Sequence, residues 1–287
     1  MAASLQSRSH VKRGWSFYAL AGFFTLFVIF LYGPMFCIYI LSFQGPNAGL
    51  TFPMQGLSFH WFIALFTQAR TGDIGGAFGR SIPLALIVLS LTVVISVAAG
   101  LAYRRRFIGA APLFYTSIAS LIVPGLVLSI GIGLMFQIIG FRPHWYSSAL
   151  GGHLSWTLPF GLLIMFAVLS RFDPALEEAG RDQGASNVQI LRYIVIPILF
   201  PGIIAVALFG FTLSYDEFPR SWVTVGPSNT LPLEIWGMTT NITSPALYAL
   251  GTVTTAISFI IIIISLGSIA IIQRRRQGLA ARRAAGG

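Results

Sequence analysis

The sequence predicts an all-α membrane protein of six transmembrane helices in a single domain, residues 1–287. Hydrophobic residues make up 55% of the chain and charged residues only 9%, and the mean hydropathy is +0.80. A chain of this composition has too little polar surface to cover a soluble globular domain. Its apolar residues also fall into runs that match the about 20 residues that a helix needs to cross a bilayer. We therefore expect a polytopic membrane protein without a soluble domain.

Six apolar runs qualify as spanning helices. They are Phe17–Phe43, Ser81–Tyr103, Pro112–Ile139, Ser147–Ser170, Ile198–Tyr215 and Tyr248–Ile272. The first run is much longer than the apolar part of a signal peptide, which has about 7–15 residues, and no small-residue cleavage site closes it. We expect it to stay in the protein as the first span.

The third run carries two features of helix packing. Pro124 predicts a kink, because proline removes a backbone hydrogen bond inside a helix. Gly125, Ser129 and Gly133 recur every four residues and form a stripe of small side chains that lets another helix approach closely. We interpret this stripe as an internal packing surface, and a subunit interface is the alternative.

Most basic residues lie at the ends of the runs on one side of the predicted membrane. That side holds Arg8, Lys12, Arg13, Arg104, Arg105, Arg106, Arg171, Arg181, Arg192, Arg274, Arg275, Arg276, Arg282 and Arg283, and the other side holds Arg70, Arg80, Arg142 and Arg220. Because cytoplasmic loops carry the excess of lysine and arginine, we expect both termini, including a basic tail over 274–287, in the cytoplasm. The placement of basic residues on the cytoplasmic side also explains the net charge of +10, so the charge does not call for a nucleic-acid partner.

The sequence argues against catalysis and against a metal or nucleotide on this chain. The only lysine, Lys12, does not follow a glycine, so no phosphate-binding loop is present. The four histidines are scattered, and the single cysteine, Cys37, excludes an intrachain disulfide and a cysteine metal cluster. The acidic residues lie in loops or at span ends, whereas an aspartyl intramembrane protease or an ion-driven carrier needs them within the membrane. We expect no catalytic residue and no cofactor.

A charged helical hairpin is predicted between the fourth and fifth runs, over 173–197. Asp173 is a typical helix N-cap, and Pro174 takes the first helical position, where a missing N–H has no cost. Gly184 can adopt the left-handed conformation that ends a helix, so the first helix should run to about Gln183.

The second helix of the hairpin has its own start and stop signals. Ser186 and Gln189 fit a capping box, and Pro197 should end the helix at the membrane surface. The two helices present apolar faces made of Leu176, Ala179, Val188, Leu191 and Ile194. Such a hairpin can dock on a cytoplasmic partner, but a loop that packs on its own bundle needs similar chemistry. The residues alone leave both interpretations open.

The hairpin also contains a spaced motif. Glu178-Ala179-Gly180 is followed by Gly184 and, nine residues later, by Ile194-x-Ile196-Pro197. This spacing resembles the EAA loop of binding-protein-dependent ABC importer permeases, usually E-A-A-x-x-x-G-x9-I-x-L-P, from which Gly180 and Ile196 depart. The resemblance implies a type I ABC importer permease fold, in which this hairpin is a coupling helix seated in a cleft of a separate ATPase subunit. It assigns that contact to Glu178, Ala179, Gly180, Asp182, Gly184 and Ala185.

The stretch after the fifth run resembles the polyamine-type permeases of this family. The elements that match are FTLSYDE at 211–217, Val225-Gly226-Pro227, Leu231-Pro232 with Trp236, and Ser244-Pro245 with Leu250, whereas Gly79-Arg80-Ser81 departs from the frequent Asn-Ser. The resemblance implies spermidine or putrescine as the solute. Asp216 and Glu217 can attract a cation, and Tyr215 and Trp222 can offer aromatic faces to it. The alternative is that these residues only mark the membrane interface.

The resemblance further implies a set of partners in a bacterial inner membrane. They are a second permease subunit, expected to be a different chain, an ATPase dimer that holds ATP and Mg²⁺, and an extracytoplasmic solute-binding protein. Two alternatives stay open at this point. The chain could be a self-sufficient channel or secondary carrier, or an ABC permease for another small solute such as an opine or an aminophosphonate.

Overall fold

The structure is a computed structural model that describes residues 14–47, 49–67, 72–104, 107–241 and 244–285. Within these ranges the chain is helical or irregular, and the only strand-like pairing is a single bridge between Gln44 and Leu57. The all-α class is confirmed. Some residues that carry the predicted orientation lie outside the described residues, namely Arg8, Lys12, Arg13, Arg70, Arg105 and Arg106.

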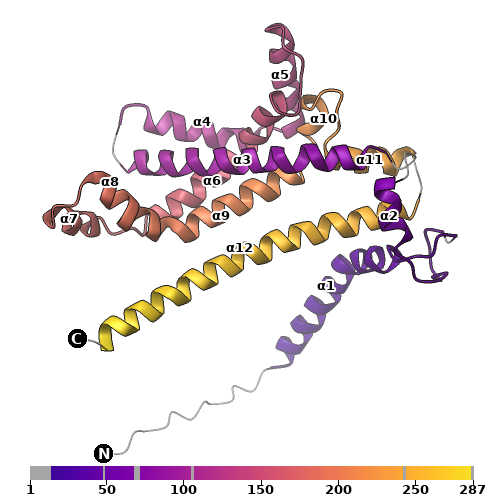
Figure 1. Ribbon diagram of the computed structural model, residues 1–287, viewed down its shortest axis with the longest axis horizontal. Helices are drawn as coiled ribbons and strands as arrows, with labels where there is room; N and C mark the ends of the chain where they lie inside the picture. Colours follow the sequence, from indigo (N-terminus) through magenta and orange to yellow (C-terminus); the bar gives the residue numbers. More distant parts are fainter. Residues whose placement is uncertain (1–13, 48, 68–71, 105–106, 242–243, 286–287) are drawn as a thin grey trace, which may run out of the picture.

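In the described part of the chain, five helices are long and apolar enough to cross a membrane. They are α1 (Trp15–Leu41), α3 (Ile74–Tyr103), α6 (Ser148–Leu169), the continuous segment Asn187–Tyr215 that ends with α9 (Ile196–Tyr215), and Ala246–Ser268 within α12 (Ala246–Ala285). A sixth crossing is formed if α4 (Ala110–Ile122) and α5 (Gly125–Ile138) count as one bent span. The six predicted apolar runs therefore all become helices (Figure 1).

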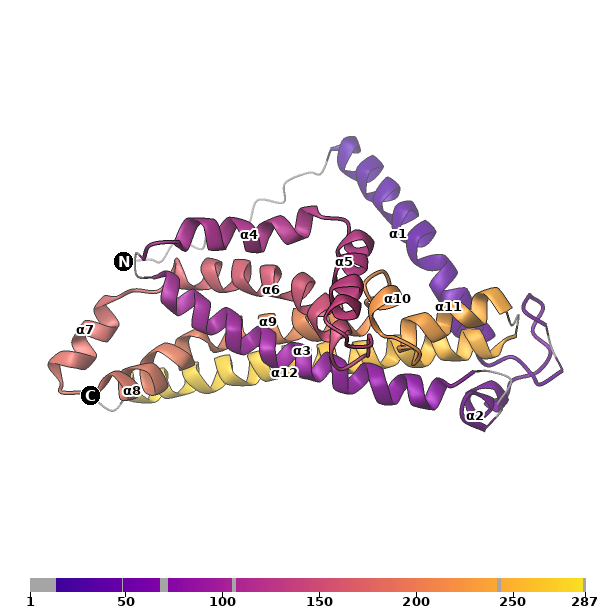
Figure 2. The ribbon, with the colours of Figure 1, turned by 90° about the horizontal axis from the view of Figure 1, so that it is seen from above.

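Helices α3, α6 and α9 form the packed centre of the bundle (Figure 2). Met165 of α6 and Leu199 of α9 are fully buried there, together with side chains of α3. Gly161 brings α6 close to α3, because a Cβ at this position would overlap the Ser96 hydroxyl. Apolar burial and small residues thus hold this centre together, as expected for helices that meet within a membrane.

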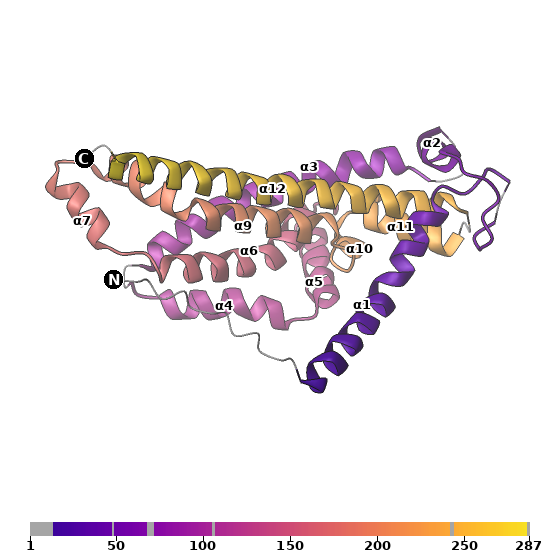
Figure 3. The same ribbon diagram turned by 90° about the horizontal axis from the view of Figure 1, so that it is seen from below.

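Helix α1 stands apart from this centre (Figures 1 and 3). It contacts α12, and Leu41 at its end is its only buried residue. Most of its other apolar side chains are exposed, apart from a few such as Ile38 and Tyr39 that are half-buried.

The third predicted run, Pro112–Ile139, changes direction at Pro124, where the sequence predicts a kink, but the helix breaks there completely and does not merely bend. Helix α4 ends at Ile122 and α5 starts at Gly125, and the two helix axes differ by 110°. Val123 and Pro124 between them have extended backbones, with ψ of 127° and 128°. Proline disfavours helical geometry in the residue before it, and packing of α5 against the short helix α10 (Ser221–Thr224) holds the new direction.

The prediction that Pro197 ends the second hairpin helix was wrong. α8 (Asn187–Ile190) continues through a π-helical turn, Leu191–Val195, directly into α9. Pro197 lies in the first turn of α9. The wider π turn directly before α9 changes the hydrogen-bond register, and proline is tolerated at this position. One continuous helical segment therefore links the hairpin to Tyr215.

The bundle has two distinct ends (Figures 1 and 3). The hairpin helices and the carboxyl end of α12 lie at one of them, which we call the hairpin end. The short helices α2 (His60–Thr67), α10 and α11 (Leu231–Asn241) lie toward the other, which we call the opposite end. None of these three short helices was predicted from the sequence.

Candidate functional site

The hairpin forms from α7 (Ala175–Asp182) and α8 as the capping signals predict. The Asp173 carboxylate accepts a hydrogen bond from the amide two residues later (3.0 Å) and starts the first helix. Gly184 has a φ of +79°, the left-handed conformation that ends it. The Ser186 and Gln189 side chains accept hydrogen bonds from each other's backbone amides, which confirms the predicted capping box.

Arg104 at the end of α3 ties the hairpin to the bundle through Glu177, which also pairs with Arg181 of its own helix. The Glu177 carboxylate accepts a hydrogen bond from Arg104 (Oε1–Nη1, 2.6 Å) and another from Arg181 (Oε2–Nη2, 3.3 Å). The Arg104 guanidinium also lies 4.6 Å from the centre of the Phe172 ring, within cation–π distance. Sequence reasoning missed Glu177. Its spacing of four residues from Arg181 was the available signal.

Gly180 lets the two hairpin helices lie close together. A Cβ at this position would lie 2.9 Å from Cδ1 of Ile194 and 3.4 Å from Cγ1 of Ile190. The departure of this position from the alanine usual in the EAA motif therefore has a packing reason.

The predicted ATPase-contact residues lie in two environments. Exposed are Glu178, Ala179, Asp182 and Gly184, and half-buried are Gly180 and Ala185. Among the described residues, no hydrogen bond or ion pair engages the carboxylate of Glu178 or Asp182. Val188 next to them is 72% exposed. The hairpin thus presents free acidic groups and apolar side chains away from its own bundle.

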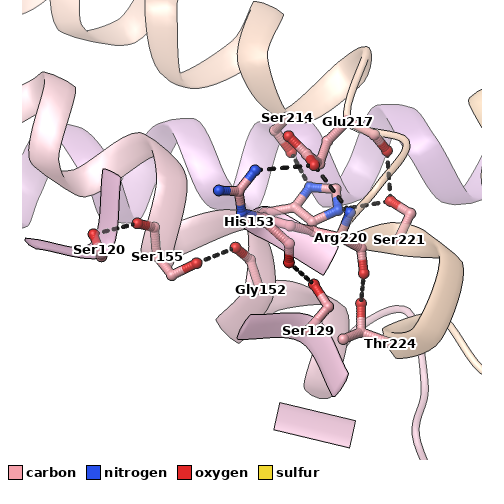
Figure 4. A network of polar contacts seen from close by, with 11 residues as sticks. Ser120, Ser129, Gly152, His153, Ser155, Ser214, Glu217, Arg220, Ser221 and Thr224 are labelled. Carbon is pink, nitrogen blue, oxygen red and sulfur yellow. Dashed lines mark hydrogen bonds and ion pairs between the residues drawn. The ribbon is translucent and has the colours of Figure 1, made fainter. Parts of the chain in front are cut away.

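A buried ion pair lies at the opposite end, just beyond α9 (Figure 4). Glu217 Oε1 accepts hydrogen bonds from the Arg220 backbone amide (3.0 Å) and from Arg220 Nη1 (3.2 Å), and both side chains are 6% exposed. The Arg220 guanidinium lies 4.4 Å from the centre of the Trp156 ring on α6. It also covers Gly125, where a Cβ would come within 2.8 Å of Nη1. Arg220 therefore connects the start of α5 to α6 and α9.

His153 of α6 completes this polar cluster (Figure 4). Its Nδ1 lies 2.8 Å from the Ser214 hydroxyl, and its Nε2 lies 3.0 Å from the Ser221 hydroxyl. Ser221 donates its only hydroxyl proton to the Glu217 carbonyl oxygen (2.6 Å). Nε2 must therefore be the donor to Ser221, and Nδ1 accepts from Ser214, which makes His153 the neutral Nε2–H tautomer. Sequence reasoning counted this histidine only as one of four scattered histidines without metal-binding spacing.

The four residues predicted to line a substrate pathway, Tyr215, Asp216, Glu217 and Trp222, differ in exposure and in whether they line a cavity. Glu217 is held inside the cluster by Arg220. Tyr215 is buried, whereas Asp216 is exposed and Trp222 is 51% exposed. Tyr215 and Asp216 line a cavity of about 380 Å³, in which Glu217 and Trp222 take no part. Arg220, counted above as a topological charge, is instead a structural partner.

Two other carboxylates at the opposite end are also engaged. Asp73 caps α3 and binds Arg80 Nη2 (2.9 Å), and this contact lowers the pKa of the Asp73 carboxyl. Glu234 accepts hydrogen bonds from the Asp73 amide and from Asn229, both at 2.9 Å. These contacts join α3, α11 and the loop before α11.

Comparison with known proteins identifies the chain. Residues 79–278 match the family described as binding-protein-dependent transport system inner membrane component. The chain belongs to this family. It is 30% identical over 246 residues to the spermidine/putrescine transport system permease protein PotC of Escherichia coli K12, covering 85% of this chain and 91% of that protein. It is 25% identical over 231 residues to the putrescine transport system permease protein PotI of the same strain, covering 78% and 80% of the two chains.

Solved structures agree on the fold. A chain of a bacterial ABC transporter involved in the import of the acidic polysaccharide alginate superposes with a TM-score of 0.69 at 16% identity, covering 92% of this chain and 97% of that one. A chain of the MetNI methionine ABC transporter gives a TM-score of 0.56 at 17% identity, covering 72% and 99%. The chain is therefore a multi-pass inner-membrane permease subunit of an ABC importer, a transport subunit without catalytic activity of its own.

Replacement of Gly184 should separate coupling from folding. The Cβ of another residue has free space there, so the cost comes from the positive φ alone, about 1 kcal/mol or more for a β-branched residue. We expect Gly184→Val to insert normally but to reduce ATP-driven uptake, whereas Gly184→Asn should keep most of it, because asparagine tolerates this conformation. Uptake by the reconstituted complex tests this, and equal activity of Gly184→Val and wild type would contradict a role of the hairpin geometry in coupling.

Proposed function

We propose that this chain forms half of the solute pathway of an ABC importer for polyamines, and that a separate ATPase drives it through the hairpin. The observation that carries the coupling role is the hairpin itself. Its Glu178 and Asp182 side chains and its apolar Val188 are exposed, and the two carboxylates have no partners among the described residues. The ion pair of Glu177 with Arg104 joins the hairpin to α3, and Gly180 lets the two hairpin helices pack closely. A surface of this kind fits a protein partner that must move the bundle rigidly.

The proposed complex contains a second permease subunit of different sequence, two ATPase subunits with ATP and Mg²⁺, and an extracytoplasmic solute-binding protein. The solved alginate ABC transporter, which is also known in complex with a substrate-loaded periplasmic protein, supports such an assembly. The outward-facing apolar surface of α1 and the unpartnered hairpin are both consistent with further subunits. ATP and Mg²⁺ would be bound by the ATPase and not by this chain.

The cargo assignment rests on the PotC and PotI relatives and on the charge of the opposite end. A cavity lined by a carboxylate, Asp216, that has no partner among the residues the structure describes suits a cation better than an anion. An opine or an aminophosphonate carries acidic groups that this carboxylate would repel. We therefore favour putrescine or spermidine over these solutes.

Uptake by the reconstituted complex tests this assignment. Vesicles that contain both permeases and the ATPase, with ATP inside and the binding protein outside, should accumulate putrescine or spermidine and should not accumulate an anionic solute of similar length. Omission of ATP or of the ATPase should abolish uptake. Transport of an anionic solute alone would overturn the cargo, and uptake by the chain without an ATPase would overturn the ABC mechanism.

We also propose that both termini lie in the cytoplasm, which places the opposite end toward the periplasm. Arg104 contacts the hairpin, Arg181 and Arg192 are part of its helical segments, and Arg171 precedes it directly, as the positive-inside rule requires for a cytoplasmic face. After replacement of Cys37, a cysteine at Ser228 should react with an impermeant thiol reagent from the periplasm, and a cysteine at Gly278 only after permeabilisation. The reverse labelling pattern would refute the orientation.

A further inference from the structure

We infer that a cavity at the hairpin end binds an anionic phospholipid, with the lipid phosphate at Arg104 and an acyl chain against a wall of aromatic rings. The cavity holds about 460 Å³ and is lined by residues of α3, α4 and α6, so it is separate from the cavity beside Asp216. Its volume is within the range of small-ligand sites, about 300–1,000 Å³. Such a site serves neither the transported solute nor the ATPase contact.

Three aromatic rings, one from each of these helices, form an apolar wall of the cavity. The ring centre of Tyr103 on α3 lies 5.1 Å from that of Phe166 on α6 and 6.5 Å from that of Phe114 on α4. The Phe114 and Phe166 ring centres lie 5.3 Å apart. Gly100 and Ala111 also line the cavity, and their small size leaves room between the helices. A wall of this kind suits a hydrocarbon chain.

Arg104 adds a positive charge to the lining. Among the described residues its guanidinium donates a hydrogen bond only to Glu177, from Nη1, and the Phe172 ring centre lies 4.6 Å from it. The other N–H donors of a guanidinium form a planar fork that matches phosphate oxygens. The Arg104 side chain is 25% exposed. It can therefore bind a phosphate without giving up its contact with Glu177.

Two tyrosine hydroxyls provide further polar groups at the cavity. Tyr103 and Tyr115 both line it, and no hydrogen bond of either hydroxyl occurs within the described part of the chain. Tyr115 is 69% exposed. Tyrosine is enriched at the level of lipid headgroups, where its ring lies in the apolar layer and its hydroxyl in the polar one. These hydroxyls can donate to the ester or phosphate oxygens of a lipid.

The cavity lies where three membrane helices have a terminus. α3 ends at Tyr103, α6 ends at Leu169 and α4 starts at Ala110, and all three residues line the cavity. Figure 2 shows these ends on the side of the hairpin. In the proposed orientation they face the cytoplasmic leaflet, which carries anionic lipids. The sequence places basic residues directly after α3 and α6, at 104–106 and at Arg171, and such residues are the usual contacts of anionic headgroups.

A phospholipid fits this combination better than other classes of ligand. A small soluble anion can use Arg104, but it gains nothing from the aromatic wall. An apolar helix of another subunit can cover the rings, but it would bury the charge of Arg104 against hydrocarbon. A lipid satisfies both parts of the cavity, because its phosphate lies at the membrane surface and its acyl chain extends into the apolar layer. The phosphate then lies next to the ion pair that joins the hairpin to α3.

The first test removes the charge of Arg104 in the complete purified complex. Titration with phosphatidylglycerol in detergent, followed by native mass spectrometry, gives the affinity of the bound lipid. We expect Arg104→Gln to weaken the tightest binding about tenfold, the effect of losing one charge-assisted contact. Glu177→Gln is the matched control, because it breaks the same ion pair but keeps the charge of Arg104, and it should bind the lipid as wild type does.

The second test fills the cavity without changing any charge. Ala111→Trp places a large side chain in the space for the acyl chain, and we expect it also to weaken binding of phosphatidylglycerol about tenfold. Ala119→Trp is its control, because Ala119 is also exposed on α4 but does not line the cavity. This control should leave the affinity unchanged. Excess inorganic phosphate should not displace the lipid from wild type.

Loss of affinity in Arg104→Gln and Ala111→Trp, with both controls at the wild-type level, supports the site. Loss in only one of these two variants, or an equal loss in Glu177→Gln, contradicts a site that uses both the charge and the cavity. Displacement by inorganic phosphate would assign Arg104 to a soluble anion, and loss of the second permease subunit from the Ala111→Trp complex would assign the cavity to a subunit interface. Either result overturns the lipid site. Because lipid binding is measured without transport, a complex that takes up amines but fails these tests keeps its proposed function.

Discussion

The buried ion pair between Glu217 and Arg220 is the constraint on which the assembly of the opposite end depends. Two charges with 6% exposed side chains are costly in an apolar bundle unless their hydrogen bonds and ionic contacts are supplied within the protein. Here Glu217 pairs with Arg220 Nη1 and with its backbone amide, and the Trp156 ring covers the guanidinium face, while the buried Nε of Arg220 has no hydrogen-bond partner among the described residues. The guanidinium in turn fills the space over Gly125, the first residue of α5. The 110° turn between α4 and α5 is thus supported by a side chain nearly 100 residues away.

The same pairing separates the roles of two adjacent acidic residues. Because Arg220 holds Glu217 inside the bundle, the C-terminus of α9 leaves Asp216 on the cavity side, without a partner in the described part of the chain. His153 fixes this arrangement from α6 through Ser214 and Ser221. At the hairpin end, Glu177 has the structural role and Glu178 remains free. Each end of the bundle therefore combines one acid that anchors the chain with one that has no partner among the described residues. On the proposed function, the continuous helical segment from Asn187 to Tyr215 carries motion from the ATPase contact to the solute cavity.

Local signals in the sequence predicted local structure well. Ser186 and Gln189 form their capping box, Gly184 takes a positive φ, and each apolar run becomes helical, because these outcomes depend on neighbouring residues alone. Long-range contacts were not predictable. Pro124 predicted the position of the break, but not its 110° angle or the packing of Arg220 over Gly125, because the sequence presents Arg220 as one more charge at a span end. Pro197 predicted a helix end, but a π-helical turn before it absorbs the change of register.

A double-mutant cycle on Glu217 and Arg220 tests the central claim most directly. The melting temperature of the purified complex would be measured for Glu217→Gln, Arg220→Met and the double variant. Loss of one partner leaves the other buried without its counter-charge, at a cost of about 3–5 kcal/mol, while replacing both removes this penalty. We predict that the double variant melts above both single variants. A double variant whose loss of melting temperature equals the sum of the two single losses would contradict the claim that this pair holds the opposite end together.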